Sequence, residues 1–137
     1  MNCIPYNYDI TIQEGGTYDK MFKWSVGITP VSLVGFIGKM QGRKKLTDTE
    51  TLVNLPSIIV PWVADGNSGI YILDDGITPD LAGTYRMYIK DDYTQGLCAN
   101  HKDIIGVYDL YLYNSSHEAV LRQYGIMTIE ASATRWV

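Results

Sequence analysis

The sequence offers few residues suited to acid–base or nucleophilic chemistry. His101 and His117 are its two histidines, and polar neighbours place both in predicted solvent-exposed loops. Ser115 or Ser116 could join His117 and Asp109 in a hydrolytic triad, but no G-x-S-x-G turn accompanies them. We therefore predict that the protein is not an enzyme.

Acidic pairs and cysteines are the remaining candidates for ligand chemistry. Asp74–Asp75 and Asp91–Asp92 supply oxygen atoms that suit calcium or glycoside hydrolysis. Neighbouring residues of a strand point to opposite faces, however, and the spacing of a calcium loop is missing, so solvated strand ends are predicted. Cys3 and Cys98 are too few for a four-ligand zinc site and are expected to be free thiols. We expect no cofactor and no metal.

Charge and hydropathy argue against two classes of partner. The chain has 11 Lys and Arg against 15 Asp and Glu, for a formal net charge of -4. Its single basic run, Arg43–Lys45, predicts a surface loop, so no nucleic acid is expected as a partner. No apolar run approaches the roughly 20 residues that span a bilayer, and the first five residues do not resemble a secretory leader. No membrane partner is expected.

The elements that must position these residues are predicted to be almost entirely β-strands. A length of 137 residues suits one domain, and 13 glycines and 5 prolines interrupt any long helical pattern. Alternating apolar residues predict strands at 18–24, 32–40, 84–91, 107–113, 119–124 and 125–131. A hairpin is predicted from Ile58 to Leu73, ending or lying at a sheet edge near Pro61. Gly125 is predicted to form a β-bulge where the last strand changes partners.

Two further segments are assigned by their turn residues. Thr78, Pro79 and Gly83 have the types and spacing that begin and end one short helical turn. Residues 92–106 lack any period and predict a long loop excursion. The prediction is thus a single all-β domain over residues 1–137, an antiparallel β-sandwich of roughly seven strands.

Tyrosine dominates the aromatic residues, with 11 Tyr against 3 Trp and 2 Phe. Tyr111 and Tyr113 share one face of a predicted strand, and Tyr88 is placed on a neighbouring strand. We predict that these three belong to the core, with a protein interface and a sugar-stacking surface as the alternatives. Trp136 is hard to place in a core so near the end of the chain, which suggests a contact with another subunit.

Several segments together resemble a known class of domain. Ile10–Tyr18, followed by Phe22–Trp24, is similar to the opening of small β-sandwich domains in virion proteins of tailed bacteriophages. The likeness continues through Gly38–Arg43, Leu81–Tyr85, Val107–Leu112 and the closing Val120–Ile129. The resemblance implies an immunoglobulin-like sandwich that serves as an adaptor or decoration on tail, baseplate, fibre or neck proteins. The 92–106 excursion and the absence of a following receptor-binding domain depart from that pattern.

We therefore expect a non-enzymatic structural protein of a bacteriophage virion, assembled in the bacterial host cytoplasm. It would be present in several copies or as a homo-oligomer and bind other virion proteins by burying surface. A carbohydrate-binding module with exposed Tyr and Trp, or a capsid decoration protein, is the alternative. The residues expected at the protein interface lie near the chain ends, at the predicted edge strand and in the excursion: Tyr6, Tyr8, Ile58, Ile59, Val60, Tyr93, Leu97, His101, Arg135 and Trp136.

Overall fold

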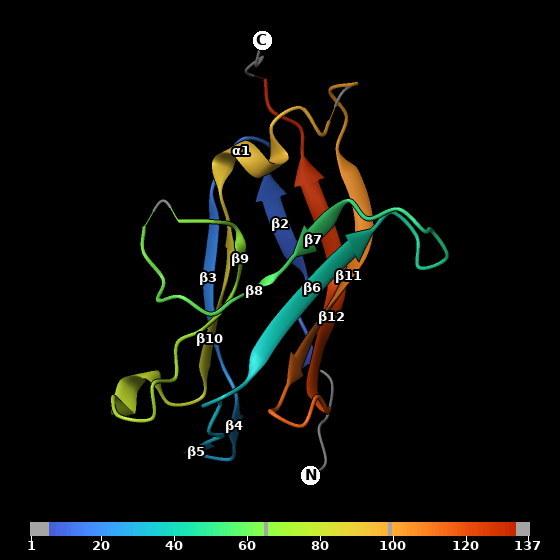
Figure 1. The fold of residues 1–137 in the computed structure, drawn as a ribbon. Coiled ribbons are helices and arrows are strands. Elements are labelled where there is room, and N and C mark those ends of the chain that lie inside the picture. The colour runs from blue at the N-terminus through green and yellow to red at the C-terminus, as the bar shows by residue number, and fades with distance from the viewer. Residues whose placement is uncertain (1–5, 65, 99, 134–137) are drawn as a thin grey trace.

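The computed structural model describes residues 6–64, 66–98 and 100–133, which form two facing β-sheets (Figure 1). The larger sheet has six strands in the order β1-β12-β11-β6-β7, with β2 also paired to β12. Its strands are β1 (Tyr6–Asn7), β2 (Ile10–Gln13), β6 (Ile37–Arg43), β7 (Val53–Leu55), β11 (Ile104–Tyr113) and β12 (Ala119–Glu130).

The smaller sheet has four strands in the order β3-β10-β9-β8. Its strands are β3 (Tyr18–Lys23), β8 (Ser57–Ile58), β9 (Gly69–Ile72) and β10 (Thr84–Ile89). Strands β4 (Ser25–Val26) and β5 (Thr29–Pro30) form a small separate hairpin. A 3-10 turn, η1 (Pro79–Leu81), and a short helix, α1 (Asp91–Thr94), complete the described elements.

The hydrophobic core lies between the two sheets, as the alternating residues predict. On β10, Tyr85, Met87 and Ile89 are buried, and on β11 the buried set includes Leu110 and Leu112. The all-β sandwich is confirmed, with the last two long strands, β11 and β12, paired in the larger sheet. Its strand orientation is mixed rather than purely antiparallel, because β1 and β2 run parallel to β12 and β8 runs parallel to β9.

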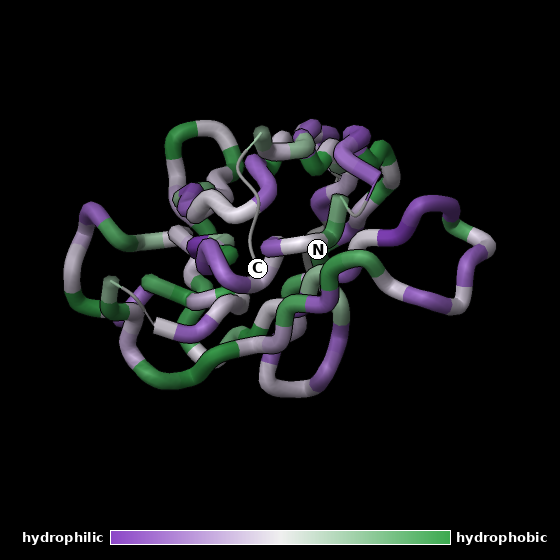
Figure 2. The backbone as a smooth tube through the Cα atoms, turned by 90° about the horizontal axis from the view of Figure 1, so that it is seen from above, coloured by the Kyte–Doolittle hydropathy of each residue, from purple (hydrophilic) through white to green (hydrophobic). Residues whose placement is uncertain are grey.

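The predicted hairpin from Ile58 to Leu73 is wrong, because the two strands are parallel. Ser57 and Ile58 pair with Ile70 and Tyr71 in a parallel register, so the chain must cross over between them. The connecting β8–β9 loop extends from one side of the sandwich, opposite the loop at residues 44–52 (Figures 1 and 2). It returns the chain to the same end of the smaller sheet.

A buried carboxylate explains why the strand predicted at 32–40 begins only at Ile37. Asp74 accepts hydrogen bonds from the backbone N–H groups of Leu33 (2.9 Å), Gly83 (2.9 Å) and Gly76 (3.0 Å). The hydrogen bond from the Leu33 N–H to Asp74 keeps the residues just before β6 in a turn, and they do not pair with a neighbouring strand. Asp74 is therefore a buried structural acceptor, not the solvated strand end that the sequence predicts.

The excursion predicted at 92–106 is not a loop throughout. Helix α1 occupies its start, and β11 begins at Ile104. Between them lies Cys98, whose thiol is free and buried. The backbone N–H of Cys98 donates a hydrogen bond to Glu14 Oε2 at 2.7 Å. Thr94 accepts a 2.9 Å hydrogen bond from the Gly15 N–H. The segment closes one end of the sandwich (Figure 1).

Gly125 lies in a regular part of the β11–β12 ladder, so the predicted bulge is wrong. The register shift falls instead between Leu112 and Tyr113. β12 does change partners at Gly125, as predicted, with β1 paired before it and β2 after it. Glycine is required there because a Cβ would lie 2.5 Å from the Tyr8 carbonyl oxygen.

The predicted helical turn is confirmed at η1, with Gly83 at a φ of 73° just after it. Thr78 precedes η1 but makes no side-chain cap, and Asp75 instead accepts from the Thr78 N–H at 2.7 Å. In the part of the chain that the structure describes, no helix is long and apolar enough to cross a membrane. Among the same residues, no three His, Cys, Asp or Glu side chains gather as a metal-binding group.

Candidate protein-binding surfaces

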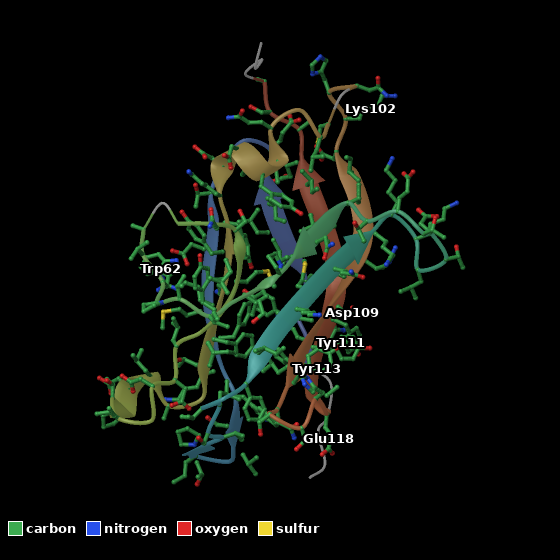
Figure 3. All side chains as sticks on the ribbon, viewed as in Figure 1. Trp62, Lys102, Asp109, Tyr111, Tyr113 and Glu118 are labelled. Carbon is green, nitrogen blue, oxygen red and sulfur yellow. The ribbon has the colours of Figure 1, made fainter. Side chains whose placement is uncertain are left out.

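The β8–β9 loop is anchored to the outer face of the smaller sheet by Trp62. The guanidinium carbon of Arg86 lies 3.7 Å from the centre of the Trp62 ring, which is a close cation–π contact. The ring of Tyr88 meets Trp62 edge-on at 6.0 Å. Tyr71 packs next to Tyr88 at 6.5 Å and donates a 2.5 Å hydrogen bond to the Asn67 carbonyl. Trp62 therefore lies inward over β10 and fixes the loop (Figure 3).

Arg86 is held from its other side by β3. Its Nε forms a 3.4 Å ion pair with Asp19 Oδ1, and its Nη2 lies 3.0 Å from the sulfur of Met21. Among the described residues, Arg86 Nη1 and Trp62 Nε1 are buried and have no hydrogen-bond acceptor. Because a buried donor without an acceptor costs about 1–3 kcal/mol, the packing of the two side chains must offset this. The contact fixes the loop at some energetic cost.

The outward side of the same loop is apolar and exposed. Ile59, Val60 and Val63 are 87%, 62% and 61% exposed, and we call these three residues the apolar ridge. The ridge continues directly from β8, which lies at an edge of the smaller sheet. Of the predicted interface residues here, Ile59 and Val60 are freely accessible and Ile58 is half-buried. An exposed apolar segment beside a sheet edge is typical of a protein-binding surface.

A second surface lies where the N-terminal strand of the larger sheet faces the edge of the smaller one. This β1–β3 cleft has a volume of about 620 Å³ and is lined by Tyr6, Tyr8, Lys20, Met21, Phe22, Lys23, Trp24, Ser25, Val26 and Tyr85. Phe22 packs edge-on against Tyr8 at 5.1 Å and stacks with Tyr85 at 5.4 Å. Lys20 Nζ lies 5.5 Å from the centre of the Tyr8 ring. The cleft therefore combines an aromatic floor with cationic side chains.

Buried polar groups fix the floor of the cleft. Tyr85 donates a 2.6 Å hydrogen bond to Gln123 Oε1, and Gln123 Nε2 donates to the Tyr108 hydroxyl at 3.0 Å. The Tyr108 hydroxyl in turn donates to the Tyr8 carbonyl oxygen. Burial raises the pKa of Tyr85 well above its usual value and that of Tyr108 to about 12, so both remain neutral. The network ties the segment after β1 to both sheets.

The predicted interface residues of the excursion divide into structural and exposed ones. The Tyr93 hydroxyl accepts from the Asn54 N–H at 2.8 Å and donates to the Asn54 carbonyl at 3.1 Å, which fixes the edge strand β7. Leu97 packs against the core. Both side chains are half-buried and have structural roles, and their predicted interface role stays a prediction. His101 is exposed, at a φ of 57°.

Tyr6 and Tyr8 both line the cleft, with Tyr6 48% exposed and Tyr8 half-buried, and their interface role stays a prediction. Arg135 and Trp136 lie outside the described residues. The structure therefore brings Tyr6 and Tyr8 together at one surface and Ile59 and Val60 at another. It does not unite the eight predicted residues that it describes into a single site.

The tyrosines predicted for the core lie on the outer faces of the sheets. Tyr111 and Tyr113 are half-buried on the outer face of β11, with ring centres 6.1 Å apart (Figure 3). Asp109 precedes them on the same face (Figure 3). Leu110 and Leu112 are fully buried on the inner face. Tyr88 is buried, but beneath Trp62 and not between the sheets.

Trp62 and Arg86 are important residues that the sequence does not reveal. They lie on different elements, and no motif links the tryptophan after Pro61 to an arginine in the middle of β10. Arg86 does stand out as the charged residue of β10. Comparison of the sequence with protein-family models and with curated protein sequences found no match.

Proposed function

We propose that the protein is a non-catalytic structural component of a bacteriophage virion that binds a larger virion protein through its apolar ridge. The observation that carries this proposal is the exposure of Ile59, Val60 and Val63 on a loop that Trp62 holds in place. Because the ridge is apolar and exposed, its partner would present an apolar surface. The resemblance of the strand and turn segments to phage tail, baseplate, fibre and neck domains supports the virion setting.

Because Trp62 anchors the loop, the exposed ridge is suited to binding a partner. A loop that is already ordered loses little conformational entropy when it is buried against a partner. The three ridge side chains would each lose contact with water, and aliphatic burial contributes about 25 cal/mol per Å² of apolar surface. Trp62 would act as a positioning residue, since it contacts Arg86 and not the partner.

The proposal is tested on particles purified from cells that express the chain together with the virion proteins. Ile59→Asp places a charge in the ridge and is expected to reduce the amount of the chain in purified particles by at least about tenfold. Leu46→Asp is the matched control, because Leu46 is 78% exposed on the loop at the opposite side of the sandwich. Absence of the unmodified chain from particles, or equal incorporation of both variants, would overturn the proposal.

Cross-linking on the same particles identifies the position of the chain. Cross-links to tail, neck, baseplate or fibre subunits would support the adaptor role. Cross-links only to the major capsid protein would instead indicate the alternative of a head decoration protein, which uses the same fold and the same type of surface. Light scattering of the purified chain reports whether it forms a homo-oligomer by itself.

A second candidate function is carbohydrate binding by the outer face of β11. Tyr111 and Tyr113 present adjacent rings, and on the neighbouring strand β6 the exposed residues Lys39 and Gln41 pair with Tyr111 and Asp109 on the same face. Apolar rings with amide neighbours suit a sugar ring and its hydroxyl groups. A glycan array tests this function: saturable binding that is lost in Tyr111→Ala but kept in Tyr6→Ala would favour it over the structural role.

A further inference from the structure

The outer edge of β3 is available for strand pairing beside the β1–β3 cleft. In the described part of the chain, β3 pairs with β10 and forms one end of the smaller sheet. Alternate N–H and C=O groups of its six residues therefore point away from β10. An unpaired edge of this kind can accept an extended segment of another protein as an additional strand.

The charge of the cleft differs from that of the whole chain. Among the described residues that line it, Lys20 and Lys23 are cationic and none is acidic, although the chain has more Asp and Glu than Lys and Arg. Both lysines belong to β3 itself, and both are exposed. A segment paired with β3 would therefore place its side chains close to two positive charges, which favours carboxylates.

The cleft is also large enough for an apolar side chain. Its volume of about 620 Å³ is within the range of pockets that bind small molecules. Phe22 and Tyr85 form a buried stacked pair in its floor, and Trp24 is half-buried beside them. An aromatic or large aliphatic side chain of the paired segment would be surrounded by rings on one side and by strand backbone on the other.

We propose that the β3 edge binds an extended, acidic segment of a second partner protein, which adds as a strand to the smaller sheet and inserts one large apolar side chain into the β1–β3 cleft. The main chain provides affinity, and Lys20 and Lys23 select acidic sequences. β3 and β8 are the two opposite edges of the same sheet. The chain can therefore hold one partner at the apolar ridge and another at β3, which is the geometry of a bridging subunit.

The test begins with a yeast-displayed library of random short peptides selected on the full-length chain. Enriched peptides are expected to be acidic and to contain one large apolar residue. Binding of an enriched peptide should protect the amides of residues 18–23 from hydrogen exchange. The double variant Lys20→Glu/Lys23→Glu should weaken that binding by at least about tenfold, while Lys39→Glu/Lys44→Glu, at exposed lysines outside the cleft, should not.

Several outcomes would overturn the inference. These are no enrichment, enriched peptides without acidic residues, protection elsewhere than β3, or equal weakening by the two double variants. A self-association of the chain that the Lys20→Glu/Lys23→Glu variant abolishes would assign the cleft to a second copy instead of a second protein. The peptide experiment needs neither virions nor the ridge, so its failure is distinguishable from failure of the proposed function.

Discussion

The hydroxyl of Tyr85 reaches across the sandwich to Gln123, 2.6 Å from its Oε1, and so joins the middle of the smaller sheet to the last strand of the larger one. Gln123 is completely buried, and both ends of its amide are used, since Nε2 donates to Tyr108. A buried polar group of this kind specifies one packing of the two sheets only while all its partners remain in place.

Gln123→Leu should therefore destabilise the fold strongly. The substitution leaves the Tyr85 hydroxyl buried without an acceptor and removes a donor to Tyr108, so we expect a loss of about 2–4 kcal/mol in the free energy of unfolding. Urea denaturation measures it. Gln95→Leu, at an exposed position after α1, should change stability by less than about 0.5 kcal/mol. If Tyr85→Phe lowers the free energy of unfolding by the same amount in the unmodified chain and in Gln123→Leu, the two side chains are not coupled.

Trp62→Ala should release the β8–β9 loop without unfolding the sandwich. Removal of the ring exposes Arg86 to water, which then hydrates its unpartnered nitrogen atoms, so most of the effect is expected within the loop. Hydrogen exchange should accelerate there and remain unchanged in β11 and β12. Val63→Ala removes an exposed side chain of the same loop and should leave exchange as it is. Equal exchange in Trp62→Ala and the unmodified chain would show that the cation–π contact does not hold the loop.

Asp74 should make the fold sensitive to acid. Burial by itself would raise the pKa of this carboxyl, but hydrogen bonds from the N–H groups of Gly83, Leu33 and Gly76 outweigh it and lower the pKa below the ordinary value of 3.8. The unfolded chain then binds the proton more readily than the folded one, so this stabilisation is complete above about pH 4 and is lost as the pH falls further.

Urea midpoints between pH 6 and about pH 2.5 measure this dependence. Asp74→Asn should be less stable than the unmodified chain at pH 6 and should lose less stability on acidification. Asp80→Asn, at an exposed acid in η1, is the control. Its stability should fall with pH as steeply as that of the unmodified chain. Identical slopes in Asp74→Asn and the unmodified chain would show that Asp74 does not contribute.

Gly125→Ala should displace the N-terminal segment. The new Cβ would lie 2.5 Å from the Tyr8 carbonyl oxygen and 2.9 Å from Asp9 Oδ1. We expect a cost of about 1–3 kcal/mol in unfolding free energy and faster hydrogen exchange at Tyr8, whose N–H donates to the Tyr124 carbonyl at 2.9 Å. Ile126→Ala, at a half-exposed neighbour, should cost less than about 1 kcal/mol. Unchanged exchange at Tyr8 would contradict the close approach.

The strands that the sequence predicts well are those in which apolar and polar residues alternate within the strand itself. Tyr85, Met87 and Ile89 alternate with more polar residues, and β10 is found where they predict it. The failures have non-local causes. Nothing near Ile58 shows that Trp62 will pack on Arg86 and carry the chain across the sheet, and Leu33 gives no sign of its bond to Asp74.

The candidate surfaces were predictable only in part for a related reason. Ile59 and Val60 belong to a short β-branched run before Pro61 that predicted a sheet edge or a strand end, and β8 does lie at an edge of the smaller sheet and ends just before them. β11 is different because both of its faces are apolar. Leu110 and Leu112 alternate with Tyr111 and Tyr113, so periodicity cannot decide which pair points inward. The neighbouring sheet decides it by covering the leucines.

The pairing of β1 and β2 with β12 has a consequence for when the fold is completed during synthesis. These contacts join residues far apart in the sequence, such as Ile10 and Met127, so they form only after β12 has left the ribosome. Tyr6 and Tyr8 cannot complete the β1–β3 cleft before that. A chain that stops before β12 therefore lacks the pairing that places Tyr6 and Tyr8 at the cleft.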